Sequence, residues 1–347
     1  MNRTMAPRVQ RLGGVVAVAG MLLLAGCGGE AEAPAASLPV SNVPATDSGR
    51  QPTKTDSGVV AAPYGGGWLA TRTLTFNNDT TGAMKAVVNL ATEVGDVAAT
   101  PGASQYAITV TLQATGPTEA EARHALATMS VGQSDTLAGG VLQLSARVAF
   151  ANYNPPPGQG VNVPGVHIGG TDANVRSASI QAVLPATLQY ALAQHTAIGN
   201  ATATGFSGSS GNVASDIGDA ALDGTWDHAS VVSQIGDATF TGDASSFEGL
   251  TQIGSVYASL APSHDTHATL TSQIGDVDLT LAGRATGGFD LYGETEIGTA
   301  AIAVHGTEPV SLSDPRKQHW QTPGYASMSP KVHVEGVTQI GDVTIHD

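Results

Sequence analysis

A five-residue motif that ends in Ile-Gly-Asp, or in a close variant of it, recurs through the second half of the chain. The successive spacings between its isoleucines are 19, 18, 18, 21, 23 and 43 residues, and a related Thr-Glu-Val-Gly-Asp ends at Asp96. Self-similarity at a period near 20 residues indicates a repeat architecture, in which each unit buries its apolar face against its neighbours. The isoleucines are Ile198, Ile217, Ile235, Ile253, Ile274, Ile297 and Ile340.

Residues 268–281 show how one unit is built. The apolar residues Ala268, Leu270 and Ile274 share one parity, and Val277, Leu279 and Leu281 share the other. Side chains alternate between the faces of a strand, so the apolar face changes side unless the chain bends at Gly275-Asp276. Each unit therefore reads as strand, Gly-Asp corner, strand. About 20 residues per unit fits one coil of a β-solenoid, and a twisted stack of meanders is the competing geometry.

The segment before the repeats has a different pattern. Strands are predicted over residues 72–76, 86–91, 106–114 and 141–150, and one helix over residues 118–129. Thr118 and Glu121 have the spacing of a capping box. The prediction is an all-β, solenoid-like or β-helix-like repeat stack (residues 176–347). An N-terminal cap with one short helix (residues 67–175) precedes it, since terminal repeats need a closing surface.

The first residues have the character of a targeting segment. Three arginines precede an apolar run over residues 12–26, which is shorter than the roughly 20 residues of a membrane span. The run closes with Leu-Ala-Gly-Cys27, which resembles the lipobox of bacterial lipoproteins. The resemblance implies that residues 1–26 are a signal peptide and that the Cys27 thiol receives a lipid. The alternative is an ordinary signal peptide with a cysteine near its end.

Residue 28 is Gly rather than Asp. By resemblance to Gram-negative lipoproteins, this implies a lipid-anchored envelope protein at the outer membrane. Cys27 is the only cysteine, so no intrachain disulfide can form.

Residues 27–66 are predicted to be a flexible tether. They are dominated by Ala, Pro, Ser, Thr, Gly and Asp, and they have too little apolar surface to offset the entropy of ordering. Removing residues 1–26, with three arginines and no acid, takes the formal net charge from −15 to −18. Between residues 177 and 314 the only basic residue is Arg284. So negative a chain repels phosphate backbones, which argues against nucleic acid as a partner.

The order of parts from residue 72 to residue 347 resembles the bacterial "putative adhesin" family with β-strand repeats, which has a domain of unknown function. It is also similar to the head domains of auto-transporter adhesins of the same kind. The matching parts are Thr-Glu-Val-Gly-Asp-Val at residues 92–97, a short Glu/Ala helix, an apolar strand with Val183-Leu184-Pro185, and the Ile-Gly-Asp ladder. The resemblance implies a secreted or surface-facing β-solenoid. It carries over no catalytic residue, and it names no ligand.

The aspartates of the motif are weak candidates for a metal site. If the units stack in register, Asp219 and Asp237 lie about 4.8 Å apart, and like charges placed opposite one another destabilise a sheet. A bound calcium ion or plain solvation at exposed corners would each relieve this, and the same applies to Asp276. The motif lacks the Gly-Gly-x-Gly-x-Asp pattern of calcium-binding repeats, which favours structural turns and no cofactor.

Other arrangements that could carry chemistry are weak. Ser263-His264-Asp265 contains the residue types of a catalytic triad, but a triad converges from separate segments. His264 and His267 have a metal-ligand spacing without a further cluster of ligands nearby. The chain has no Gly-x-Ser-x-Gly elbow and no phosphate-binding loop of the Gly-x-x-x-x-Gly-Lys type.

Two loops are possible recognition surfaces. Residues 152–172 are rich in proline and glycine, and residues 309–330 hold Arg316, Lys317, Trp320 and Tyr325 in a region otherwise short of basic and aromatic residues. Such residues are favoured at binding hot spots. The alternative is that Trp320 and Tyr325 fold back and pin the second loop. Trp226 is expected to be a packed turn residue.

The first functional hypothesis is a non-enzymatic envelope lipoprotein, anchored in a membrane, whose repeat domain mediates adhesion or contact with an unidentified surface protein or glycan. The second is a structural envelope element that self-associates. A third, remote hypothesis is an envelope glycan hydrolase, for which no motif supplies paired carboxylates.

Overall fold

The computed structural model describes residues 50–347, apart from residue 103 and residues 152–160, 164–165, 169–174 and 283–286. The described residues belong to one compact unit. They form one large sheet of 22 strands, a small two-stranded ladder, one α-helix and one short 3₁₀ helix. The prediction of an all-β fold with a single short helix is confirmed for these residues.

The elements of the N-terminal half are β1 (Thr53–Asp56), β2 (Val60–Tyr64), β3 (Gly67–Asp79), β4 (Lys85–Val94), β5 (Val97–Gly102), β6 (Gln105–Gly116), α1 (Glu119–Ala127), β7 (Met129–Ala138), β8 (Val141–Phe150), β9 (Val161–Val163), β10 (Val166–Ile168) and β11 (Arg176–Pro185). The elements of the C-terminal half are β12 (Gln189–Ile198), β13 (Ala201–Ile217), β14 (Ala220–Ile235), β15 (Ala238–Ile253), β16 (Val256–Leu260), β17 (Thr266–Ile274), β18 (Val277–Leu281), β19 (Gly288–Ile297), β20 (Ala300–Ala303), β21 (Glu308–Asp314), β22 (Lys317–Gln321), η1 (Tyr325–Ser327), β23 (Lys331–Ile340) and β24 (Val343–His346).

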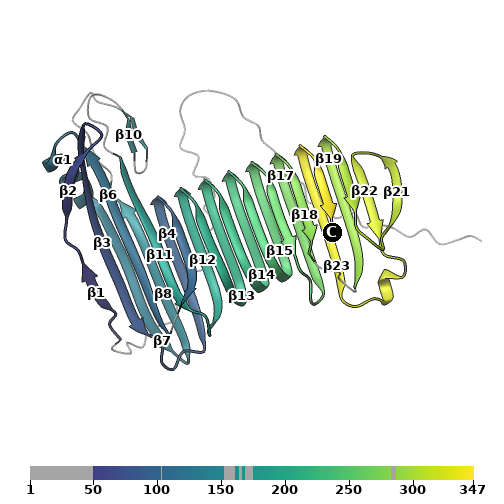
Figure 1. Ribbon diagram of the computed structural model, residues 1–347, viewed down its shortest axis with the longest axis horizontal. Coiled ribbons are helices and arrows are strands. Elements are labelled where there is room, and N and C mark those ends of the chain that lie inside the picture. Colours follow the sequence, from purple (N-terminus) through teal and green to yellow (C-terminus); the bar gives the residue numbers. More distant parts are fainter. Residues whose placement is uncertain (1–49, 103, 152–160, 164–165, 169–174, 283–286) are drawn as a thin grey trace, which may run out of the picture. The chain divides into compact units, whose positions relative to one another are not determined.

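Successive repeats pair in parallel, which distinguishes a solenoid from a stack of meanders. Ile217 of β13, Ile235 of β14 and Ile253 of β15 lie opposite one another, and the pairing carries through both halves of each repeat. In the repeats, the longer strand segment before each Ile-Gly-Asp corner pairs with its equivalents in one ladder, here called the long ladder. The shorter segment after the corner pairs in a second ladder, here called the short ladder (Figure 1). The long ladder runs β8, β4, β12, β13, β14, β15, β17, β23, β19, β22 and β21. The short ladder runs β6, β11, β5, β13, β14, β15, β16, β18, β24 and β20.

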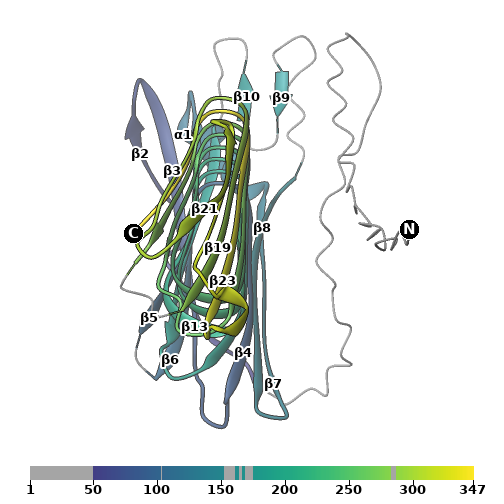
Figure 2. The same cartoon turned by 90° about the vertical axis from the view of Figure 1, so that its right-hand side faces the viewer.

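The core lies between the two ladders, which face each other across a narrow layer (Figure 2). Several glycines on the long ladder, among them Gly211, Gly249 and Gly336, lie opposite apolar side chains of the short ladder. A Cβ added to Gly211 would come within 2.9 Å of the side chains of Leu222 and Trp226, so the two sides fit closely. Trp226 is 1% exposed. It lies inside β14 as a core residue, which confirms its predicted packing but places it in a strand rather than in a turn.

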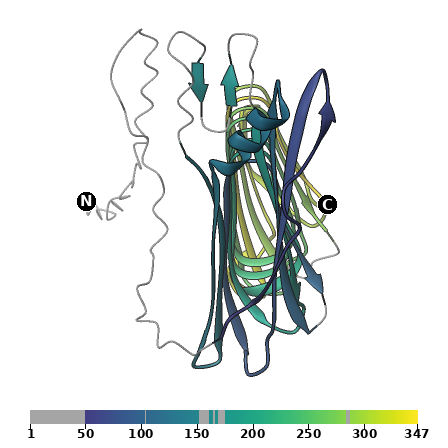
Figure 3. The same cartoon turned by 90° about the vertical axis from the view of Figure 1, so that its left-hand side faces the viewer.

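The N-terminal part closes one end of the stack. Strands β3, β6 and β11 pair antiparallel, in contrast to the parallel repeats. Helix α1 packs against β6 and β3 through Ala122, Ala125 and Leu126 (Figure 3). Thr118 and Glu121 form the predicted capping box, with the Thr118 side chain accepting from the Glu121 backbone N–H. The predicted strands at residues 72–76, 86–91, 106–114 and 141–150 lie within β3, β4, β6 and β8.

The predicted tether ends earlier than residue 66. Residues 53–56 and 60–64 form β1 and β2, which pair antiparallel with β3. Both strands are largely exposed, so the low apolar content of these residues is compatible with strand structure. Cys27, the signal peptide and residues 27–49 of the tether lie outside the described residues, as does most of the predicted loop 152–172. No helix within the described part of the chain has the length and apolarity to cross a membrane.

The order of coils in the stack differs from their order in the chain. The last two strands, β23 and β24, pair with β17 and β18 on one side and with β19 and β20 on the other. The corner at Ile340 therefore lies between those at Ile274 and Ile297. The 43 residues between Ile297 and Ile340 include the hairpin β21–β22, which accounts for the predicted insertion. After the hairpin, the chain runs back and places β23 and β24 between two earlier coils.

Candidate contact surface

The glycine of each corner motif adopts a backbone conformation that other residues rarely reach. From Gly199 to Gly341, the seven corner glycines have φ between 134° and 149°. A Cβ at any of them would come within 1.9–2.3 Å of the carbonyl oxygen of the corner glycine below it in the stack. The motif therefore requires glycine both for its φ and for the close approach of successive coils.

The Ser or Thr two residues before the isoleucine joins each corner to the coil below. Its hydroxyl donates a hydrogen bond of 2.7–2.9 Å to the carbonyl oxygen of the preceding corner glycine, as Ser233 does to Gly218. These side chains are buried at 0–2% exposure. The motif therefore has Ser or Thr at this position because the hydroxyl supplies a hydrogen-bond donor to the buried glycine carbonyl at the bend.

The aspartate column, suggested by the sequence as a weak metal site, forms a ladder of hydrogen bonds. Asp219 accepts from the backbone N–H of Asp237, Asp237 from that of Ser255, and Asp276 from that of Asp342, at 2.8–2.9 Å. Asn200 and Ser255 take the same place in the column, each accepting the backbone N–H of the next corner. Among the described residues no group of three His, Cys, Asp or Glu side chains could hold a metal ion. The geometry accounts for these aspartates as structural turn residues.

The isoleucines of the motif point outward, which the parity of residues 268–274 does not predict. Ile274 shares the parity of Leu270, yet it is 49% exposed while Leu270 is fully buried. The bend at the corner turns its side chain out of the core. Six of them form a continuous row at the edge between the ladders, here called the isoleucine ridge: Ile217, Ile235, Ile253, Ile274, Ile340 and Ile297, at 46–64% exposure.

The ridge has an end at the N-terminal cap. Val94, which takes the isoleucine position of the first corner, is only 8% exposed, and Ile198 is partly buried against the core. Strand β11 packs on this corner, since the Ile180 backbone N–H donates to the carbonyl oxygen of Asp96. The first two corner side chains, Val94 and Ile198, are therefore buried or partly buried, and the exposed ridge begins at Ile217.

The segment predicted as a recognition loop, residues 309–330, is mainly a β-hairpin. Strand β22 pairs antiparallel with β19 and closes the end of the long ladder. Lys317 forms an ion pair with Glu294, and Arg316 forms one with Asp314 at 3.1 Å. The Trp320 side chain packs against the core and donates to Gln318 at 3.2 Å.

Tyr325 is partly buried and lies beside Gly288, where a Cβ would come within 2.9 Å of its ring. The four predicted binding residues thus do not converge on one exposed patch. The two aromatic residues occupy positions that hold the hairpin down, and their role in binding stays a prediction.

The predicted trio Ser263-His264-Asp265 does not form a relay. Ser263 and His264 both contact Asp243, and His264 also bonds Ser245 at 3.0 Å. The Asp265 carboxylate accepts the backbone N–H of Lys331, 66 residues away in sequence. His267 stacks on His333, with ring centroids 5.0 Å apart, so His264 and His267 do not share a ligand.

Histidines serve as the main partners of aspartates in a half of the chain that has few Lys or Arg. Asp290 is the clearest case, with Oδ1 2.7 Å from His319 Nε2 and Oδ2 3.0 Å from His333 Nδ1. Gln321 donates to the same carboxylate at 3.0 Å. Partial burial alone would raise the pKa of Asp290, but these hydrogen bonds outweigh it and hold the pKa below its usual range.

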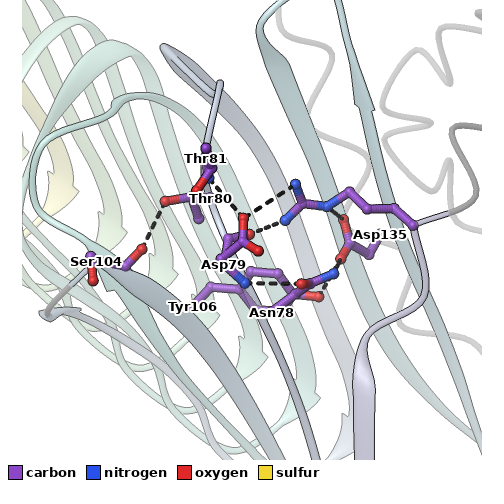
Figure 4. Close-up of polar contacts among 8 residues, drawn as sticks. Asn78, Asp79, Thr80, Thr81, Ser104, Tyr106 and Asp135 are labelled. Carbon is purple, nitrogen blue, oxygen red and sulfur yellow. Dashed lines mark hydrogen bonds and ion pairs between the residues drawn. The ribbon is translucent and has the colours of Figure 1, made fainter.

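The cap contains a buried charged cluster that the sequence did not reveal (Figure 4). The Asp135 carboxylate accepts from Tyr106 at 2.7 Å and from Asn78 at 3.0 Å, and it lies 3.3 Å from Arg50 Nε. Burial, together with the hydrogen bond to Asp135, raises the pKa of Tyr106, so the phenol stays protonated. Through this cluster Arg50 is bound to residues of β3, β6 and β7. The cluster therefore has a structural role, because it attaches the start of the described chain to the cap.

No family model and no curated protein matches the chain. One solved structure, of a "putative cell adhesion protein" from Clostridium sporogenes, covers 85% of this chain and 99% of its own, at 11% identity and a TM-score of 0.31. A likeness at that TM-score does not establish a shared fold or a shared function.

Proposed function

We propose that the chain is a non-enzymatic, lipid-anchored protein of the bacterial envelope whose repeat stack presents a contact surface to another macromolecule. The observation that carries this proposal is the isoleucine ridge. Six large apolar side chains, each about half exposed and neighbours in successive coils, are an unusual surface for a protein without a partner, because contiguous exposed apolar patches mark interaction sites.

The remaining features of the repeats favour a scaffold over a catalyst. The hydroxyl, glycine and aspartate columns satisfy backbone groups of the next coil, so the motif is accounted for by stacking. The Asp290 carboxylate is held by two histidines and a glutamine on the outer face of the long ladder. No observation favours glycan hydrolysis.

A photo-crosslinking residue at position 253, in the full-length protein on intact cells, tests the contact surface. The matched control is position 183, where the native valine is 41% exposed on β11, close to the 50% of Ile253. A defined adduct at position 253 and none at position 183 is expected. Equal labelling at both positions, or none at either, would overturn the proposal.

The lipid anchor has a test of its own. Cys27→Ser should abolish labelling by a radioactive or clickable fatty acid, because that thiol is the acceptor implied by the lipobox-like residues. Lipid labelling that persists in the variant would remove the anchor from the proposal and leave the contact surface standing.

A further inference from the structure

We propose that the partner of the isoleucine ridge is the ridge of a second copy of this chain, with the two stacks parallel and a twofold axis running along the ridge. The inference rests on the proposed function and names its partner. It follows from two properties of the ridge, its periodicity and the unlike chemistry of its two sides.

The periodicity favours a copy of the same surface. Parallel pairing places successive ridge isoleucines about 4.8 Å apart, the spacing of adjacent strands. A row of side chains at that repeat can contact another row along its whole length only if the second row has the same repeat. A second copy supplies such a row by construction, and twofold pairing closes the assembly because each ridge is used once.

The two sides of the ridge differ in charge. The residue just before each ridge isoleucine lies on the outer face of the long ladder, and in the middle of the ridge this residue is an exposed glutamine. The residue two after the isoleucine lies on the short-ladder side, and there it is mostly aspartate. The amide side consists of Gln234, Gln252, Gln273 and Gln339, and the acidic side consists of Asp219, Asp237, Asp276 and Asp342.

This difference selects the orientation. With the axis along the ridge, the acidic side of one copy faces the amide side of the other, and glutamine N–H groups can donate to carboxylates. With the stacks antiparallel, each acidic side faces the other acidic side. Arg316 and Lys317 lie beside the Ile297 end of the ridge. Because Arg284 is the only basic residue between residues 177 and 314, the segment that supplies Asp219, Asp237 and Asp276 has little basic charge of its own to offset that repulsion.

The ends of the ridge limit the paired length. Asp216 and Glu296 replace glutamine at the first and last exposed positions. Pairing is therefore centred on Ile235, Ile253 and the two coils that follow in the stack. The parallel orientation also brings the two N-terminal caps to the same end, which is compatible with two chains anchored in one membrane.

Cysteine crosslinking of the full-length protein tests the register. Cys27 is the only native cysteine, so Cys27→Ser gives a background without thiols. In the parallel dimer Ile253→Cys faces its own equivalent, and mild oxidation should give a disulfide-linked dimer. Val183→Cys should stay monomeric. A mixture of Ile217→Cys and Ile297→Cys reports the antiparallel arrangement, in which these positions would meet.

Charge variants test the orientation without relying on disulfides. Gln273→Glu places a carboxylate opposite Asp276 of the partner and should raise the dissociation constant at least tenfold in sedimentation equilibrium. Adding Asp276→Asn, which keeps an acceptor for the next corner, should restore most of the affinity. Far-ultraviolet circular dichroism checks that each variant folds.

The outcomes separate the two proposals. A position-253 photo-adduct of twice the chain mass, together with the Ile253→Cys dimer, supports homotypic pairing. An adduct of another mass, with a protein that sediments as a monomer at about 100 μM, overturns the pairing and leaves the contact function intact. Crosslinking between positions 217 and 297 overturns the parallel orientation.

Discussion

Asp237 accepts a hydrogen bond from the backbone of Ser255 and donates its own backbone N–H to Asp219. Each corner residue therefore orders the next coil and is ordered by the one before. The carboxylates tolerate their closeness because every one of these bonds is charge-assisted, and such bonds are stronger than neutral ones. Asn200 shows that the column needs an acceptor at this position and does not need a charge.

Replacing Asp237 separates these two requirements. Asp237→Ala removes the acceptor for the Ser255 N–H and should lower the free energy of unfolding by about 1 kcal/mol. Asp237→Asn keeps the acceptor and relieves repulsion from Asp219, so its stability should equal or exceed that of the native chain. Urea denaturation measures both. An alanine variant as stable as the asparagine variant would show that the hydrogen bond contributes nothing.

The lowered pKa of Asp290 predicts that the stability of the protein depends on pH in the acidic range. Its pKa in the folded protein lies below the usual 3.8. Its contribution to stability is therefore present above pH 4 and is lost as the pH falls through the folded value. The urea midpoints of the native chain and of Asp290→Asn should differ most at neutral pH and converge below about pH 4. A difference that stays constant down to about pH 3 would contradict the assignment.

The sequence predicts the corner but not the direction of its side chains. The Gly-Asp pair is visible as a bend because glycine reaches positive φ and aspartate bonds nearby amides. The exposure of Ile274 is not visible, because the parity rule holds only within a straight strand and the bend begins at that residue. The candidate site therefore lies on residues that the sequence pattern places in the core.

Among the elements, the hairpin β21–β22 closes the C-terminal end of both ladders. It pairs with β19 on the long ladder, and it also reaches the open edge of β20. The Ala300 backbone N–H donates to the Pro315 carbonyl oxygen at 2.9 Å, and that of Ile302 donates to Gln318 Oε1 at 3.2 Å. An unpaired edge strand invites aggregation, and the hairpin occupies the donors that would allow it.

The hairpin should depend on Trp320 more than on its basic residues. Trp320→Ala removes an aromatic side chain that packs against the core and should cost about 2 kcal/mol, less than for a fully buried tryptophan. Lys317→Ala should leave the urea midpoint nearly unchanged, since exposed ion pairs contribute little. Equal losses in the two variants would count against the capping role of Trp320.

The elements that the sequence does not predict are those held by distant partners. Strands β1 and β2 have no apolar alternation, and they form because β3 offers hydrogen-bonding partners. The hairpin reads as a loop because its proline and polar residues resemble a connection. The strands and the helix of the cap are predictable because alternation and a capping box are local signals.

On the scale of the whole molecule, the order of the coils in the stack differs from their order in the sequence. Strands β23 and β24 complete both ladders between coils that were laid down earlier in the sequence. Without them, β17 and β19 would each present an unpaired edge. The repeat spacing alone does not predict this order, since identical motifs can stack in any sequence that their connections allow.

A chain that ends at residue 330 tests this role. It should unfold at a markedly lower urea concentration than the full chain, or fail to fold, because two ladders are interrupted. Adding a synthetic peptide of residues 331–347 should restore part of the lost stability in proportion to its concentration. A truncated chain with the native urea midpoint would show that the inserted strands are dispensable.

The middle of the stack has a further property. Ile217, Ile235 and Ile253 are 18 residues apart, and β14 pairs with β15 without a register shift from Ala220 to Ile235. A tandem duplication of 54 nucleotides in this region would add one coil whose contacts above and below match those already present. The length of the stack can thus change by recombination between repeats without disturbing either end. Related genes could therefore encode stacks of different length with the same two ends.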